Sequence, residues 1–348
     1  MTDDLLKLVK GAKRILITSH ISPDPDALCS TILLGMTLEL NFPSKKILMN
    51  LEERPSGLDF IEGIEQAEFA PVASSVEQFK PDLFILLDGN NYDRCSRLDG
   101  QRVRDYLRTN RVKTAVIDHH ELAGKDEVDV FINHKSPAVA QDIYEACFRR
   151  MGLKKPSNAD FLAMVGFYAD TGGFVYIKPE QSAKAFKFAE ELVANGVNVE
   201  AIKNNLESYT EDDLKVIAEF MSNIGHGKDY TYSFLSDAFV GNWLKSGHTH
   251  SELQRPSNAF LNGFIRNIGG RRWGFTVLKN ILEGDNFYSV SYRSQDGKPD
   301  VSVMATKLGG GGHKPAAGAK FSAKNVEDAL RKVRAAINGS SAGAVDED

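Results

Sequence analysis

The sequence has few cysteines, and their arrangement argues against two classes of protein. Only Cys29, Cys95 and Cys147 occur in 348 residues, and no two of them form a Cys-x-x-Cys pair. An odd number of well-separated cysteines disfavours both a disulfide framework and a zinc site built on cysteine. We therefore expect three free thiols in a reducing compartment, which indicates a cytoplasmic protein.

Long apolar runs and an excess of positive charge are also absent. No apolar stretch approaches the roughly 18 residues that a membrane span needs, and residues 1–14, MTDDLLKLVKGAKR, lack the apolar centre of a secretory signal. The formal net charge is −5, from 42 Lys+Arg and 47 Asp+Glu. This balance disfavours broad, charge-driven binding to duplex nucleic acid but is compatible with a small basic pocket. We expect no membrane partner.

Length and composition indicate a globular protein of about two domains. At roughly 150 residues per domain, the chain holds about two of them, and 42% hydrophobic with 26% charged residues is ordinary for such proteins. The apolar pattern changes after residue 227. We expect a first domain at 1–208, a connector helix at 209–228, a second domain at 229–340 and a disordered tail at 341–348.

The first half has the pattern of a parallel sheet covered by helices on both faces. Continuous apolar runs predict buried strands at 13–19, 45–50, 82–88 and 112–118. Helical spacing predicts helices at 27–40, 138–151, 158–169, 181–195 and 198–207. This alternation favours an α/β fold with a doubly wound, mostly parallel sheet. The alternating strands after residue 229 favour a smaller α+β domain.

Ionisable side chains follow three of the expected parallel strands and one helix. The set comprises His20, Asp24 and Asp26 after the first strand, Asp88 after the third, Asp118, His119 and His120 after the fourth, and Asp170 at the end of the helix. The carboxyl ends of parallel strands meet at one edge of a sheet, where ligands bind. We therefore expect these groups to lie together.

Aspartates crowded at one edge would repel one another unless cations balance them. Two divalent ions would offset four carboxylates, and the imidazoles would complete the ligand shells; Mn²⁺ suits this mixture of donors. Each motif alone has a simpler interpretation, because a D-x-D pair is usually a turn and a strand-terminal aspartate is often a helix cap. Their joint occurrence is what predicts a two-metal site.

The complete set of motifs resembles the DHH phosphoesterase superfamily. HxxxDxD at 20–26, the strand-terminal Asp88, DHH at 118–120 and DTGGF at 170–174 carry the resemblance in the first half. In the second half, KLGGGGHKPAAGA at 307–319 resembles the glycine-rich motif of the DHH-associated C-terminal domain. The size and layout are similar to the stand-alone oligoribonuclease/pAp-phosphatase group.

The resemblance implies a role for each of these positions. One Mn²⁺ would be held by His20, Asp24 and Asp88, and the second by Asp26, Asp88, His119 and Asp170. His120 would contact phosphate or donate a proton, and Asp118 would orient the histidines. These roles are expectations of the resemblance, and they make Asp88 the shared ligand.

The glycine run at 309–312 suggests a substrate site in the second half. Glycines let backbone N–H groups approach an anion without interference from Cβ, and an arginine can offer a planar fork to phosphate. A glycine run alone is more often a flexible loop. Together with the resemblance, it favours substrate binding by Arg293, Gly310, Gly311, Gly312 and His313.

The expected activity is hydrolysis of a phosphoester bond by two-metal-assisted attack of water on phosphorus. The substrates would be short single-stranded oligonucleotides (nanoRNA) or 3′-phosphoadenosine 5′-phosphate (pAp). Two alternatives stay open at this point, a cyclic-dinucleotide phosphodiesterase and a non-catalytic nucleotide sensor. Members of the group are often dimers, so a homodimer is expected by analogy.

Overall fold

The computed structural model describes residues 2–96, 99–120 and 127–338, and these form two compact units. The first unit is Met1–Ser208 and the second is Tyr209–Asp348. The domain limits expected from the sequence, including the separate connector helix, stay a prediction, and the expected disordered tail at 341–348 lies outside the described residues. Each unit has its own sheet and its own hydrophobic clusters.

The first unit is built on a six-stranded sheet with the order β3-β2-β1-β4-β5-β6. Every neighbouring pair is parallel. The strands are β1 Arg14–Ser19, β2 Lys46–Leu51, β3 Glu68–Phe69, β4 Leu83–Leu87, β5 Lys113–Ile117 and β6 Val130–Ile132. This order is that of a doubly wound fold, which confirms the expected fold class.

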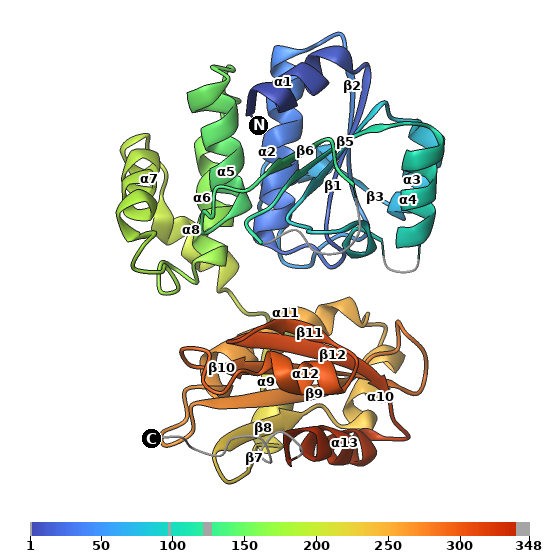
Figure 1. The fold of residues 1–348 in the computed structure, drawn as a ribbon. Coiled ribbons are helices and arrows are strands. Elements are labelled where there is room, and N and C mark those ends of the chain that lie inside the picture. The colour runs from blue at the N-terminus through green and yellow to red at the C-terminus, as the bar shows by residue number, and fades with distance from the viewer. Residues whose placement is uncertain (1, 97–98, 121–126, 339–348) are drawn as a thin grey trace, which may run out of the picture. The chain divides into compact units, whose positions relative to one another are not determined.

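Helices cover both faces of this sheet (Figure 1). The helices of this unit are α1 Thr2–Gly11, α2 Pro25–Asn41, α3 Val72–Phe79, α4 Gly100–Thr109, α5 Val139–Tyr144, α6 Ala159–Asp170, α7 Ser182–Ala194 and α8 Val199–Leu206, with short helical turns η1 Ile64–Gln66, η2 Tyr92–Arg94 and η3 Glu145–Arg150. Helices α7 and α8 pack against α6. Ile15 and Ile17 pack with α2, α5 and α6, whereas Leu16 packs with α3 and α4. The continuous apolar runs thus reflect burial on both faces.

Helix α2 begins directly after the loop that follows β1. Asp24 is its N-cap, and the Asp24 carboxylate accepts a hydrogen bond from Ala27 N at 3.0 Å. Pro25 occupies the first helical turn, where a missing N–H costs nothing. The helix is therefore started by the same loop that carries candidate metal ligands.

The second unit has a mixed sheet with the order β11-β12-β10-β9-β8-β7. Its strands are β7 Gly225–His226, β8 Tyr230–Phe234, β9 Trp273–Lys279, β10 Phe287–Ser294, β11 Gly311–His313 and β12 Ala316–Ser322. Strands β8 and β9 are parallel, and the other neighbours are antiparallel. Burial alternates strictly along β10, as the sequence pattern predicts.

Helices also pack on this second sheet. They are α9 Glu211–Ser222, α10 Asp237–Lys245, α11 Gln254–Phe260, α12 Ser302–Lys307 and α13 Val326–Asn338, with turns η4 Ser251–Leu253 and η5 Leu261–Ile265. Phe275 and Val277 of β9 pack in one cluster with α12 and α13. Val216 and Phe220 of α9 pack in another cluster with α10 and α11.

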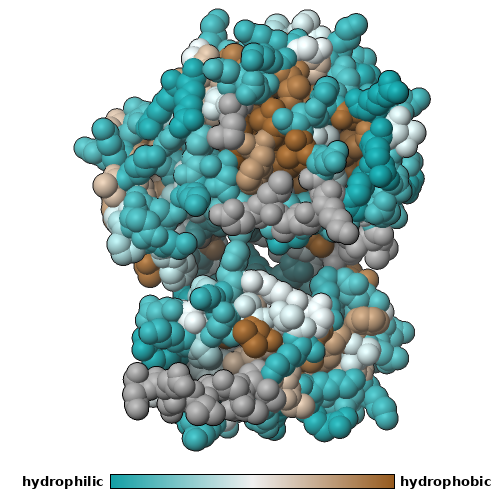
Figure 2. Space-filling view, in the orientation of Figure 1, coloured by the Kyte–Doolittle hydropathy of each residue, from teal (hydrophilic) through white to brown (hydrophobic). Residues whose placement is uncertain are grey.

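The visible surface of the first unit is mostly hydrophilic, with apolar residues gathered over the strands between α2 and α4 (Figure 2). Within the described ranges, no helix combines the length and the apolar character that a bilayer crossing requires.

Candidate metal centre

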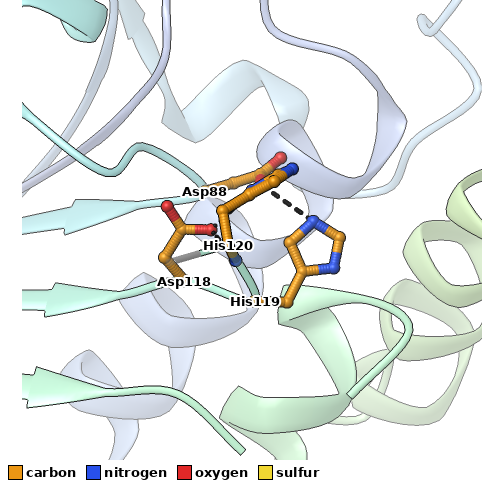
Figure 3. Close-up of side chains that lie close together, drawn as sticks. All are labelled: Asp88, Asp118, His119 and His120. Carbon is orange, nitrogen blue, oxygen red and sulfur yellow. Dashed lines mark hydrogen bonds and ion pairs between the residues drawn. The ribbon is translucent and has the colours of Figure 1, made fainter. Parts of the chain in front are cut away.

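The carboxyl ends of three adjacent strands carry the candidate ligands. His20 follows β1, Asp88 follows β4, and Asp118 follows β5, and these strands are neighbours in the sheet. Figure 3 shows Asp88, Asp118, His119 and His120 gathered beyond the ends of the strands. The structure therefore brings together the groups that the sequence analysis expected to meet.

One potential ligand group consists of His20, Asp24 and Asp88. The His20 Nε2 atom lies 3.4 Å from Asp88 Oδ2 and 3.8 Å from Asp24 Oδ2. The other ring nitrogen, Nδ1, is 2.7 Å from the carbonyl oxygen of Ile21. A hydrogen bond from Nδ1–H to this carbonyl directs Nε2, the metal-binding atom, at the two carboxylates.

A second potential group contains Asp88, Asp118, His119 and His120. His119 repeats the geometry of His20, because its Nδ1 is 3.1 Å from the carbonyl oxygen of Pro137. Its Nε2 lies 3.5 Å from Asp88 Oδ1 and 3.6 Å from Asp170 Oδ2. Each oxygen of Asp88 thus faces a different histidine.

Asp118 holds His120 in place. Its Oδ1 accepts hydrogen bonds from the backbone N–H of His120 and lies 2.8 Å from His120 Nδ1. The Asn133 side chain donates to the carbonyl oxygen of His120 at 2.6 Å. The His120 ring is therefore fixed through its Nδ1 atom by a fully buried carboxylate.

Asp26 is fully buried and reaches the start of α5. Its Oδ2 accepts from Val139 N at 2.7 Å and its Oδ1 from Ala140 N at 3.0 Å. A Cβ added at Gly166 of α6 would overlap Asp26 Oδ1. Asp26 thus links α2, α5 and α6, and it is in neither of the two compact ligand groups described above.

The site contains buried oxygen atoms without hydrogen bonds, and this is the test of whether a metal fits. Among the described residues, Asp88 Oδ1, Asp118 Oδ2 and Asp170 Oδ2 are buried and have no hydrogen-bond partner. An unsatisfied buried carboxylate oxygen is costly. Asp88 is also held at a φ of 50°, a strained region for a residue with a side chain. Carboxylates and imidazoles arranged in this way fit one or more divalent cations.

The pKa values show the repulsion that such cations would relieve. Burial raises the pKa of Asp26 to about 7, together with repulsion from Asp88 and Asp24. Burial and repulsion from Asp26 likewise raise the pKa of Asp170 well above its ordinary value. Burial alone would lower the pKa of His20, but its interactions with Asp88 and Asp24 outweigh this and raise it to about 9.

In the second unit, Arg293 and His313 lie on one line across three strands. Arg293 of β10 pairs with Ala316 of β12, and Ala316 pairs with His313 of β11. The Arg293 side chain donates to Asn262 Oδ1 at 3.0 Å, and burial lowers its pKa to about 10, with a smaller effect of Arg266. The guanidinium is therefore oriented by η5.

The glycines beside His313 are required by close backbone approach. Gly312 has a φ of 139°, and a Cβ there would lie 2.6 Å from Ala317 Cα. A Cβ at Gly310 would overlap the carbonyl oxygen of Gly318, whereas Gly311 has open space around it. Gly311 and Gly312 are thus part of an ordered strand, β11, which lies against β12. A glycine run alone would more often be a flexible loop.

The half-buried His134 and the buried Asp142 form a pair for which the sequence indicated no role. The Asp142 side chain is fully buried in α5, and His134 Nδ1 lies 3.3 Å from its Oδ1. Arg150 donates to His134 Nε2 at 2.9 Å. The negative charge of Asp142 also contributes to the raised pKa of His119. A single acidic residue within the apolar segment VAQDIY was the available signal.

Comparison with family models gives two matches that together span both units. Residues 14–164 match the DHH family, N-terminal domain, and residues 265–339 match the DHHA1 domain. The first match contains every described candidate ligand except Asp170, and the second contains Arg293, the glycine run and His313.

Curated relatives align over nearly the whole chain. The bifunctional oligoribonuclease and PAP phosphatase NrnA of Bacillus subtilis (strain 168) is 27% identical over 92% of this chain and 93% of the relative. The protein of the same name from Thermus thermophilus is 24% identical over 96% of this chain and 91% of the relative.

Solved structures share the fold. An exopolyphosphatase-related protein from Bacteroides fragilis has a TM-score of 0.79 at 22% identity, covering 97% of this chain and 95% of that one. RecJ from Thermus thermophilus, solved in complex with Mn²⁺, has a TM-score of 0.52 at 17% identity, covering 99% of this chain and 54% of that one.

Proposed function

Because the chain carries the DHH family N-terminal domain and the DHHA1 domain and is a hydrolase of phosphoester bonds, we propose that it hydrolyses short oligoribonucleotides and pAp. The names of its relatives support these substrates. The observation that carries the proposal is the position of Asp88, whose two oxygens face His20 and His119. A carboxylate placed in this way suits a bridge between two cations.

The proposed ligands are distributed around this bridge. His20, Asp24 and Asp88 would hold one ion, and Asp26, Asp88, His119 and Asp170 would hold the other. Mn²⁺ is the proposed metal because the donors are carboxylate oxygens and imidazole nitrogens. Asp26 keeps acceptor capacity for such a role, since a carboxylate has about four lone-pair sites, and two backbone N–H groups and the Ser30 hydroxyl use three of them. When bound, a metal pair supplies Lewis-acid polarisation of the phosphoryl group and lowers the pKa of water.

Residues of the chain itself would donate the proton that the leaving group needs. Asp118 accepts from His120 Nδ1, so the ring atom that would exchange a proton with the leaving oxygen is Nε2. The backbone bond from His120 N to the same carboxylate oxygen keeps the ring orientation fixed. His120 is therefore the proposed general acid, and Asp118 its positioning residue.

The second unit would supply the substrate's anchor. Arg293 offers a guanidinium already oriented by Asn262, and His313 lies on the same line across the sheet, with Ala316 between them. Gly311 has open space at its Cβ position and leaves the backbone there open to an anion, with Gly310 and Gly312 on either side of it. These five residues are proposed to bind a phosphate of the nucleotide.

Location and assembly belong to the same proposal. All three cysteines are free and buried, which suits a protein of the reducing cytoplasm, the location we propose. We propose a homodimer, to be tested by light scattering of the purified protein.

A substrate panel tests the activity. The purified protein would be incubated with Mn²⁺ and with pApA, longer RNA oligomers, pAp or c-di-AMP, and the products resolved by length. We expect cleavage of pApA and pAp. Cleavage of c-di-AMP with neither linear substrate cleaved would replace the proposal with the cyclic-dinucleotide alternative, and no cleavage of any substrate would refute it.

A further inference from the structure

The segment after α6 is a strained turn that begins at the candidate ligand Asp170. Gly172, Gly173 and Phe174 have consecutive φ values of 56°, 65° and 72°. Two glycines adopt this region freely, but an aromatic residue there is strained. Something in the surroundings must therefore hold Phe174 in place.

Packing and hydrogen bonds hold the turn. The Phe174 ring is 5.9 Å from that of Phe167 and 5.5 Å from that of Tyr168, both in α6. Phe174 N donates to Thr171 Oγ1 at 3.1 Å, and Tyr176 N donates to the carbonyl oxygen of Thr171 at 2.8 Å. Phe174 thus acts as an inward anchor, and the residues after it are forced outward.

The two residues after the anchor are apolar and exposed. Val175 is 76% exposed and Tyr176 is 50% exposed. The Tyr176 ring lies directly on Gly172, where any Cβ would overlap it. Gly172 is two residues from Asp170, whose Oδ2 is 3.6 Å from His119 Nε2. The turn that starts at the candidate ligand Asp170 therefore carries an exposed aromatic ring, which lies over Gly172.

We propose that Tyr176, with Val175 beside it, is the surface on which a nucleobase of the substrate stacks while the adjacent phosphate is cleaved. Single exposed apolar residues are common and need no ligand. Here, however, backbone strain, a glycine with left-handed φ under the ring and an inward anchor combine to hold the ring on the turn that starts at Asp170. Stacking on an aromatic ring accepts any base, which suits a hydrolase of mixed-sequence fragments. The inference rests on the proposed function.

Tyr176→Ala and Tyr176→Phe test the stacking. We expect Tyr176→Ala to raise KM for pApA about tenfold with kcat within about twofold, and Tyr176→Phe to retain the wild-type KM. A dinucleotide that lacks one base, tested in both positional isomers, should show which base is stacked, because one isomer will be insensitive to Tyr176→Ala. The matched control is Tyr209→Ala, an exposed tyrosine of similar accessibility at 45%.

Three results would overturn the inference. They are an unchanged KM for Tyr176→Ala, an equal loss on pApA and on both base-free isomers, or a change from dimer to monomer in light scattering with no effect on KM. Gly172→Ala should displace the ring and reproduce the KM effect. If wild-type protein cleaves no dinucleotide, the proposed function fails, and binding of AMP to metal-free wild type and Tyr176→Ala still tests the stacking.

Discussion

At the scale of single residues, the candidate site depends on how each histidine is oriented. His20 and His119 both place Nδ1 against a backbone carbonyl and direct Nε2 at carboxylates. Two loops that are distant in the sequence thus favour the same tautomer, with the proton on Nδ1 and with Nε2 available to a metal. Asp88 lies between the two rings and is the residue whose loss should affect both groups.

Asp88→Asn should remove activity without unfolding the protein. We expect turnover of pApA to fall at least about 100-fold, since even outer-shell partners of metal ligands matter by 10–100-fold. The increase in Tm on adding Mn²⁺ should disappear as well. Asp105→Asn, at an exposed pair with Arg108, is the control and should behave as wild type. Native turnover in Asp88→Asn would disprove the bridging role.

The pH dependence of metal binding follows from His20 and Asp26. Their pKa values are raised to about 9 and about 7 in the metal-free protein. A ligand must lose its proton to bind a cation, so Mn²⁺ affinity should rise between pH 6 and 9, with protons released on binding.

The stability of the metal-free protein should change in the opposite direction. Protonated His20 stabilises the fold below its unfolded pKa near 6.5, and this contribution is lost as the pH rises through about 9. Ionisation of Asp26 is unfavourable in the fold, so stability also falls as the pH rises from about 4 to 7. Thermal unfolding in a chelator and in Mn²⁺ from pH 5 to 9 checks both trends. An Mn²⁺-induced rise in Tm that is the same at every pH would contradict them.

At the scale of elements, the close packing of α2, α5 and α6 positions Asp26. A Cβ added at Gly166 of α6 would lie 2.4 Å from Asp26 Oδ1 and 2.8 Å from Ala140 Cβ. A side chain at this position must push helices apart or displace the carboxylate. The packing of these helices therefore also determines the position of the proposed ligand Asp26.

Gly166→Ala should destabilise the protein by about 1–3 kcal/mol, the usual cost of overpacking. Gly241→Ala is the matched control, because Gly241 lies within α10 with nothing near its Cβ position. Alanine there should leave stability unchanged or increase it slightly. Denaturation in a chelator gives both values. Equal stability of the two variants would show that α6 can move without cost.

The sequence predicted the long elements well and the short ones poorly. Strand β4 at Leu83–Leu87 lies within the expected 82–88, because a run of five buried apolar residues has a strong signal. Strand β6 at Val130–Ile132 was not expected, because a run of only three residues gives almost no strand signal in the sequence. Within the segment 209–228, expected to be a connector helix, α9 ends at Ser222 and β7 follows at Gly225–His226. There, pairing with β8 replaces the continuation of the helix.

The candidate site was predictable at the level of strand ends but not of contacts. The order of parallel strands explains why His20, Asp88 and His119 meet. No sequence pattern shows that Asp26 accepts from Val139 N, 113 residues away. The left-handed backbone of Phe174 was likewise hidden, since it depends on packing against α6 and on a hydrogen bond to Thr171.

At the scale of the whole molecule, catalysis and anchoring are assigned to different units. The proposed ligands all belong to the first unit, whereas Arg293 and His313 belong to the second. Each unit has a separate hydrophobic core. A substitution among the proposed metal ligands should therefore leave substrate binding by the second unit intact. A substitution of Arg293 or His313 should likewise leave metal binding intact.

Arg293→Ala should raise KM for pApA about 10- to 100-fold, as expected for loss of a charge-assisted contact with phosphate. The rise in Tm caused by Mn²⁺ should stay at the wild-type value. Arg331→Ala is the control, because Arg331 is exposed and pairs with Asp328 in α13. Loss of the Mn²⁺ effect in Arg293→Ala would show that the two tasks are not separate.

The chain order of the candidate ligands has a consequence for biosynthesis. A ribosome releases the chain from its N-terminus, so the loop with His20 appears first and Asp170 appears 150 residues later. Because the sheet pairs β1 with β4, and α6 follows all six strands, a nascent chain exposes an unfinished cluster of acidic groups for much of its synthesis. Acquisition of the full set of donors is thus a late event, postponed until α6 has left the exit tunnel.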